Sequence, residues 1–184
     1  MRLLIYEWSC SGGMQSEMAR MILKKMPPVG FLNEGRLMIE ALAWDASKNM
    51  DIDVTVMVDE TLPPEDAPQL PEDSAVQSVA CGRDIKLLLE IAPDFDHIIF
   101  IAPETQGVLV HSLQEIENAG FGDRLTNCPI PFVIAASDKH TTCTILAAAG
   151  IPTPTGYTVP AGGGLPDDCH LPAVLKPRMS AGCD

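Results

Sequence analysis

The sequence predicts an α/β fold with an open, mostly parallel sheet and flanking helices. Short β-type runs alternate with helical patterns along the chain, as expected for strands joined by right-handed crossovers. The clearest strand, His97–Ala102, is apolar throughout, which is typical of a parallel strand covered on both faces. We therefore expect a Rossmann-like sheet in the larger, amino-terminal part of the chain.

The elements of the first half follow from periodicity and from turn residues. Apolar residues at helical spacing predict a helix over 14–26 that ends at Pro27-Pro28. Asn33 is the expected N-cap of a second helix. The remaining expected elements are strands at 2–8, 53–58 and 75–79, a helix at 84–91 and a Pro- and acid-rich surface loop at 61–73.

The second half is expected to continue the alternation. A helix over 105–118 with Gly120 as its C-cap should follow the strand at His97–Ala102. Phe132–Ala135 is the next expected strand, and Ser137 should N-cap a helix that ends at Gly150. The 162–164 glycine run is expected to be a mobile loop between two short strands, the second of which ends at Lys176.

Length and composition limit the class of protein. A chain of 184 residues suits one domain, or one domain and part of a second. The net charge of −13 argues against binding to nucleic acid or to an anionic membrane. No apolar run approaches the ~20 residues of a spanning helix. The six scattered cysteines have no metal-site spacing, so we expect reduced thiols in a cytoplasmic protein.

Acidic and small residues are expected at the carboxyl ends of the strands, where open parallel sheets bind ligands. They are Glu7 with Ser11 and Gly12 behind it, Asp59, Glu104 and Ser137-Asp138. This set suits an amine or hydroxyl ligand, and the glycine patterns of dinucleotide and P-loop sites are absent from the sequence. The alternative is that these carboxylates cap a helix or face water.

The tail has the composition of a phosphate site. A predicted strand ends at Lys176, and a loop containing Arg178, Ser180 and Gly182 follows. An ammonium group and the backbone N–H groups of a small-residue loop together suit polyphosphate. The alternative is that Lys176 is a solvated surface lysine.

Three motifs in order resemble the entry to the ATP-grasp fold. They are Ser137-Asp138-Lys139, Gly150-Ile151-Pro152-Thr153-Pro154 and Val174-Leu175-Lys176-Pro177 before a glycine-containing loop. The segments 6–13 and 31–38 resemble the branch of ATP-dependent carboligases typified by the tyramine–glutamate ligases of methanofuran biosynthesis. Each motif alone could be only a helix cap or a helix stop, and their order is what favours the family.

The resemblance implies two domains and a nucleotide site. Residues 1–136 would be the α/β pre-ATP-grasp domain, and 137–184 the truncated beginning of an α+β ATP-grasp domain. In that family two lysines placed like Lys139 and Lys176 contact the nucleotide phosphates, and the loop at 178–184 would form a lid over them. Glu7 would be a possible contact of the amine substrate.

The implied reaction is ligation of a carboxylate to an amine, or to a thiol, through an acylphosphate. ATP and Mg²⁺ would be needed, and small-molecule carboxylates and amines would be the partners. The family's Mg²⁺ ligands lie on later strands, so we expect the chain alone to be inactive, as the amino-terminal part of a ligase. The alternative is a non-catalytic α/β domain that binds a small molecule or another protein.

Cys10 and the histidines are further candidates for chemistry. Cys10, between two serines in a tight loop, is either a nucleophile at a helix start or a structural residue, and the second is favoured because no histidine is near it in sequence. The four histidines have no ligand spacing, so no metal is expected on this chain. Residues from Ala161 onward are expected to be disordered or to pair between copies, the latter giving a homodimer.

Overall fold

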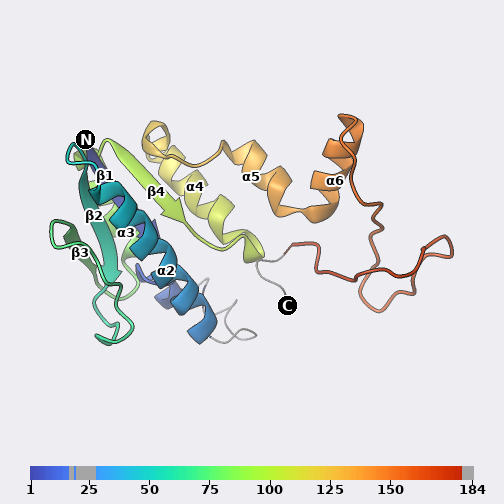
Figure 1. Cartoon of the computed structure of the whole chain (residues 1–184), viewed down its shortest axis with the longest axis horizontal. Coiled ribbons are helices and arrows are strands. Elements are labelled where there is room, and N and C mark those ends of the chain that lie inside the picture. Colours follow the sequence, from blue (N-terminus) through green and yellow to red (C-terminus); the bar gives the residue numbers. More distant parts are fainter. Residues whose placement is uncertain (17–18, 20–27, 180–184) are drawn as a thin grey trace. The chain divides into compact units, whose positions relative to one another are not determined.

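The fold is α/β, with a four-stranded parallel sheet flanked by helices in a Rossmann-like arrangement (Figure 1). It is taken from a computed structural model that describes residues 1–16, 19 and 28–179. The strand order is β3-β2-β1-β4. The elements are β1 (Arg2–Glu7), α2 (Pro28–Ser47), β2 (Asp53–Asp59), β3 (Ala75–Val79), α3 (Asp84–Ile91), β4 (His97–Ile101), α4 (Val108–Asn118), α5 (Ile130–Ser137) and α6 (Lys139–Ala148).

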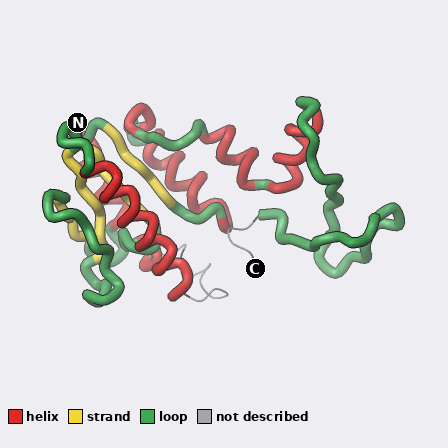
Figure 2. The backbone as a smooth tube through the Cα atoms, in the orientation of Figure 1, coloured by secondary structure: helices red, strands yellow, loops and turns green. Residues whose placement is uncertain are grey.

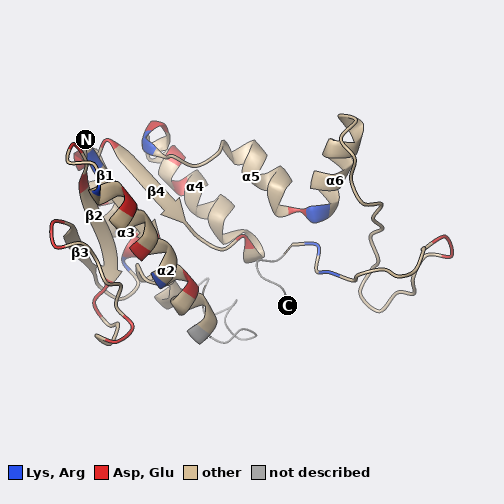
Figure 3. Cartoon of the chain, in the orientation of Figure 1, with Lys and Arg blue, Asp and Glu red and all other residues tan. Residues whose placement is uncertain are grey.

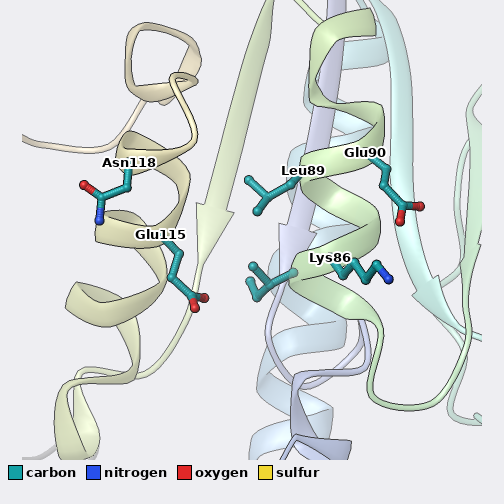
Figure 4. Close-up of a pocket in the computed structure, with 6 residues that line it drawn as sticks. Lys86, Leu89, Glu90, Glu115 and Asn118 are labelled. Carbon is teal, nitrogen blue, oxygen red and sulfur yellow. The ribbon is translucent and has the colours of Figure 1, made fainter.

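The order in which the chain adds strands to the sheet reverses at β1: β2 and β3 lie on one side of it and β4 on the other. Strand β1 pairs with β2 on one side, with Leu3 opposite Val54, and with β4 on the other, with Leu3 opposite His97. The crossover from β1 to β2 and the one from β3 to β4 therefore run in opposite directions. Right-handed connections then place α2 on one face and α3 on the other, as Figure 4 shows with β1 between the two helices. The carboxyl ends of β1 and β4 form the switch point in this topology.

The core has two layers because both faces of the sheet are covered. Residues 3–7 of β1 are all buried, as expected for a central parallel strand. The layer beneath α2 consists of Leu3, Ile5, Cys10, Ile39, Ala43, Val54 and Val56. Tyr6 belongs to the other layer, since its hydroxyl reaches Asp84 on α3.

The free edge of β4 is covered by the segment after α4. Leu125 bridges Ile98 in parallel fashion, and the backbone N–H of Thr126 donates to the Ile98 carbonyl at 3.0 Å. The Asn127 amide nitrogen donates to the Phe100 carbonyl at 2.8 Å. These bonds satisfy edge carbonyls that would otherwise be open to another strand.

The chain divides into two compact units. The sheet unit comprises Met1–Pro103 and Gly107–Asn127, and the second unit comprises Glu104–Gln106 and Cys128–Asp184. The described part of the second unit contains α5 and α6, and then loop from Ala149 to Met179 (Figure 2). The domain boundary expected between residues 136 and 137 stays a prediction.

Most strands expected from the sequence are confirmed, and the helices differ in places. The expected helix at 14–26 lies almost wholly outside the described residues. Helix α2 already begins at Pro28, so Asn33 is not an N-cap, and its side chain accepts a hydrogen bond from Arg36 within the helix. The fixed φ of proline suits a first helical turn. Helix α4 begins only at Val108, because Gln106 (φ 55°) and Gly107 (φ 75°) adopt left-handed conformations.

The expected strand at Phe132–Ala135 is wrong, because these residues lie within helix α5. A four-residue apolar run does not distinguish a strand from a helix. Pro131 lies in the first turn, where a missing N–H has no cost. Ser137 ends this helix, its hydroxyl donating to the Val133 carbonyl at 2.7 Å, and the N-cap of α6 is Asp138.

The strands expected in the tail are also wrong. Residues 151–179 contain no strand in the structure, and Val174 and Leu175 are 79% and 82% exposed. A strand needs a hydrogen-bonded neighbour, and the described second unit offers no strand to pair with. Lys176 therefore lies in loop structure and does not end a strand.

Candidate functional site

The carboxyl end of β1 holds a buried carboxylate. Glu7 is 4% exposed, and its Oε2 accepts hydrogen bonds from the backbone N–H groups of Ser9 and Cys10, both at 3.0 Å. The Ser9 hydroxyl donates to the same oxygen at 2.6 Å. Burial raises the pKa of Glu7 above its usual value, although these donors act in the opposite direction. Glu7 therefore shapes the loop that follows it.

Cys10 lies in that loop and is buried. Burial, followed by the charge of Glu7, raises the pKa of the Cys10 thiol to about 12. The thiol is therefore protonated at neutral pH, whereas the thiolate is the reactive form. This geometry favours a structural role for Cys10.

Ser11 and Gly12 anchor the same loop to the sheet. The Ser11 hydroxyl donates to the Met57 carbonyl at 2.7 Å and accepts from the Glu7 backbone N–H at 3.1 Å. Gly12 has a φ of 93°, and a Cβ there would lie 3.2 Å from a Val79 methyl carbon. Three of the four predicted substrate residues thus lie together at the end of β1 and in the loop after it, and the hydrogen bonds of Glu7 and Ser11 are made to groups within the protein. Their contact with a substrate stays a prediction.

Two glycines, Gly13 and Gly35, allow the close packing of this region. A Cβ on Gly35 of α2 would lie 2.1 Å from Glu7 Oε2 and 2.2 Å from the Ser9 hydroxyl. A Cβ on Gly13 would lie 2.2 Å from Trp8 Cδ1. A glycine in a helix interior signals such an approach, so Gly35 could have been singled out. Helix α2 can cover Glu7 only because residue 35 has no side chain.

A buried tyrosine next to Glu7 was missed altogether. The Tyr6 hydroxyl donates to Asp84 Oδ2 at 2.7 Å, and both residues are buried. The Tyr6 ring stacks on Phe100, with centroids 4.4 Å apart. Burial, and then the charge of Asp84, raises the pKa of Tyr6 well above its usual value. Residues 6 and 84 are far apart in sequence, and no motif links them.

The second unit brings together residues that the sequence had linked to phosphate. Asp138 caps α6, accepting from the backbone N–H groups of His140 (3.0 Å) and Thr141 (3.2 Å). Arg178 donates from Nε to both Asp138 oxygens at 2.8 Å, and its Nη2 lies 2.6 Å from Oδ2. The Lys139 backbone N–H donates to the Arg178 carbonyl at 3.2 Å. The start of α6 and the tail therefore meet.

The other predicted site residues are placed less closely. Lys176 and Lys139 are exposed. Ser180 and Gly182 lie outside the described residues. Glu104 follows β4 and is half-buried, in a segment that groups with the second unit. Figure 3 shows acidic and basic residues side by side between α5 and α6.

An open groove of about 650 Å³ lies between α3 and α4 in the sheet unit. Leu89 and Glu115 extend into the space between the helices, whereas Lys86 and Glu90 turn away from α4 (Figure 4). None of the predicted site residues is in its lining, which consists of Ile85, Lys86, Leu89, Glu90, Glu115 and Asn118. The groove thus lies apart from the predicted chemistry.

Neither a metal site nor a membrane helix emerges from the described residues. Within residues 1–16, 19 and 28–179, no three His, Cys, Asp or Glu side chains gather to hold a metal ion. The described residues thus form no such cluster for the Mg²⁺ whose ligands the ATP-grasp resemblance places on later strands. No helix in the same part of the chain is long and apolar enough to cross a membrane.

The fold and site define an α/β protein with a parallel, Rossmann-like sheet and a smaller second unit. No protein-family model, curated protein or solved structure matches the chain. The fold is thus described from its own topology, and the ATP-grasp resemblance rests on the sequence motifs alone.

Proposed function

We propose that this chain is the amino-terminal part of an ATP-dependent carboxylate–amine or carboxylate–thiol ligase that acts through an acylphosphate. Residues 1–136 would be the pre-ATP-grasp domain, and those from 137 onward the start of the ATP-grasp domain. The single observation that supports this most is the meeting of Asp138-Lys139 with Arg178. Motifs that are about forty residues apart in the sequence become neighbours.

The residues near this contact suit a polyphosphate. Lys139 is exposed at the first residue of α6, and Lys176 is exposed two residues before Arg178. Phosphoryl transfer depends mainly on aligning anions and neutralising their repulsion, for which cationic side chains are the protein's means. We assign nucleotide binding to Lys139, Lys176 and Arg178, with Ser180 and Gly182 in the loop beyond.

The proposed reaction has two steps, a phosphoryl transfer and an acyl transfer. A carboxylate oxygen of the first substrate attacks the γ-phosphorus of ATP, and ADP leaves. The amine nitrogen, or the thiol sulfur, then attacks the acyl carbon, phosphate leaves and the nucleophile loses its proton. The proposed contacts for the carboxylate and amine substrates are Glu7, Ser11, Gly12 and Glu104. We also propose that the protein is cytoplasmic and forms a homodimer.

Binding of ATP to this chain is the direct test. We expect a weak interaction, with a dissociation constant of roughly a millimolar or more, and backbone amide shifts at Lys139, His140 and Arg178 in an NMR titration. Lys139→Ala and Lys176→Ala should weaken it. Lys86→Ala is the matched control, because Lys86 is an exposed lysine of the sheet unit.

Three results would contradict the proposal in different places. Equal affinity in the wild type and in Lys176→Ala would remove Lys176 from the site. No shift around Lys139 at any ATP concentration would favour the alternative of a non-catalytic binding or interaction domain. Substantial ATP turnover by the purified chain would contradict the expectation that it is inactive alone.

A further inference from the structure

Asp138 is the acceptor for five donor contacts from two segments of the second unit. Two come from the first free backbone N–H groups of α6, at His140 and Thr141. Three come from Arg178, whose Nε bridges both oxygens at 2.8 Å while Nη2 lies 2.6 Å from Oδ2. Arg178 thus already binds an oxyanion, and that oxyanion belongs to the protein.

The two partners differ in their access to solvent. The side chain of Asp138 is 15% exposed, whereas that of Arg178 is 54% exposed. An anion in solution can therefore reach the guanidinium group without displacing Asp138 from the helix start. A guanidinium group binds carboxylate and phosphate oxygens with the same planar geometry, so the two anions compete for the same donors.

The backbone at residue 178 is held separately from its side chain. The Lys139 N–H donates to the Arg178 carbonyl at 3.2 Å, and this bond does not involve the guanidinium group. By rotating its side chain, Arg178 can exchange Asp138 for an anion from solution while its main chain stays bound to the start of α6. Asp138 keeps the two α6 amides when Arg178 leaves, so the helix cap is preserved.

We propose that Asp138 is an internal competitor for Arg178, which polyphosphate must displace before Arg178 contributes to its binding. This inference rests on the proposed function, because it assigns a regulatory contact to the same nucleotide site. It predicts that the wild-type chain binds polyphosphate more weakly than a chain in which residue 138 cannot hold Arg178. The opposite role, in which Asp138 positions Arg178 for the ligand, predicts weaker binding in that variant.

The test uses inorganic tripolyphosphate, titrated into the whole chain and followed by calorimetry and by the Arg178 Nε–H signal in NMR spectra. Asp138→Ser and Asp138→Asn both retain a good N-cap residue and lack the negative charge. We expect each to bind tripolyphosphate about two- to fivefold more tightly than the wild type, the range that exposed ion pairs allow. Far-UV circular dichroism checks that α6 is intact.

The double variants separate the possible outcomes. Adding Arg178→Gln to either substitution should abolish the gain and leave binding weaker than in the wild type. Equal or weaker binding in both Asp138 variants, with wild-type binding still dependent on Lys139, would overturn the competition and leave the proposed function standing. No tripolyphosphate binding by any variant would overturn both.

Discussion

Two carboxylates, one in each unit of the molecule, use the same local hydrogen bonds. Glu7 accepts from the backbone N–H groups two and three residues further on, and Asp138 does the same. Each also accepts from a side chain, the Ser9 hydroxyl in one case and Arg178 in the other. The sequence shows neither side-chain partner of these two acids.

Their pKa values nevertheless shift in opposite directions. Burial raises the pKa of Glu7, and its neutral or dipolar donors oppose this only in part. Arg178 holds the pKa of Asp138 well below its usual range. Two hydrogen bonds from backbone N–H groups at a loop or helix start therefore do not decide the direction in which the pKa of an acid shifts. The direction is decided by burial away from water in Glu7 and by a charged partner in Asp138.

The largest effect is expected where α2 meets Glu7. Gly35→Ala places a methyl group 2.1 Å from Glu7 Oε2, so the helix or the carboxylate must move. We expect a loss of about 3 kcal/mol in the free energy of unfolding, measured by urea denaturation. Gly30→Ala in the same helix is the control, because its Cβ meets no described atom within 4 Å. It should gain up to about 1 kcal/mol, and equal effects at the two glycines would contradict the packing.

The next effect concerns Tyr6, whose neutral side-chain hydroxyl is the hydrogen-bond donor to the buried carboxylate of Asp84. Tyr6→Phe removes the hydroxyl that donates to Asp84 and leaves a buried carboxyl without it, so we expect a loss of about 2 kcal/mol. Tyr157→Phe is the control, since Tyr157 is 40% exposed and its hydroxyl donates to the Asp168 carbonyl at 3.2 Å. It should change the free energy of unfolding by less than about 0.5 kcal/mol.

The pH dependence of stability in the wild type and in Tyr6→Phe gives a second test of this tyrosine. The pKa of Tyr6 is raised by burial, so its contribution to stability is complete below its usual value of 10.0 and is lost as the pH rises through the folded-state pKa. The wild type should therefore lose stability above that pH more steeply than Tyr6→Phe. Parallel curves for the two proteins would show that Tyr6 ionises as freely in the folded state as in the unfolded state.

The sheet could be predicted well because its signals are local. Strands β1 and β4 are mostly apolar runs and β2 is rich in β-branched residues, and such local patterns predict a strand without information from elsewhere in the chain. The same logic failed at Phe132–Ala135, where an equally apolar run is helix α5. It failed again at Val174-Leu175, because a strand forms only where another strand is available.

The candidate site was predictable only in part, for a similar reason. Glu7, Ser11 and Gly12 are close in sequence, and their shared loop followed from the end of a strand. The bond from Tyr6 to Asp84 and the contact of Asp138 with Arg178 join residues 78 and 40 positions apart. Such pairs depend on which helix covers which strand, or on where a loop returns, and a motif in one segment cannot reveal its partner.

A smaller effect is expected from the charge of Glu7. Because its pKa is raised, its contribution to stability is greatest below its usual value of 4.5 and is lost as the pH rises through the folded-state pKa. The difference in unfolding free energy between the wild type and Glu7→Gln should therefore move against the wild type as the pH rises above 4.5. Glu60→Gln, the same change at an exposed residue, corrects for net charge. A pH-independent difference would mean that the hydrogen bonds to Glu7 offset the effect of burial on its pKa.

The smallest effect is expected at Asp138, and it is best read from the titration of that one carboxyl. Arg178 lowers its pKa, so the interaction is complete above the usual value of 3.8 and is lost as the pH falls through the folded-state pKa. In Arg178→Gln the NMR titration midpoint of the Asp138 carboxyl carbon should rise. Asp96 is the internal control, because its pKa is lowered chiefly by the Arg2 backbone N–H, and its midpoint should not change.

The result bears directly on the contrast with Glu7. Asp138 and Glu7 receive the same two backbone bonds, so a rise in the Asp138 midpoint in Arg178→Gln would assign the difference between the acids to the guanidinium group as well as to burial. An unchanged midpoint would mean that Arg178 is not held by Asp138 in solution. Burial alone would then separate the two carboxylates, and Arg178 would be open to polyphosphate without any competition from within the chain.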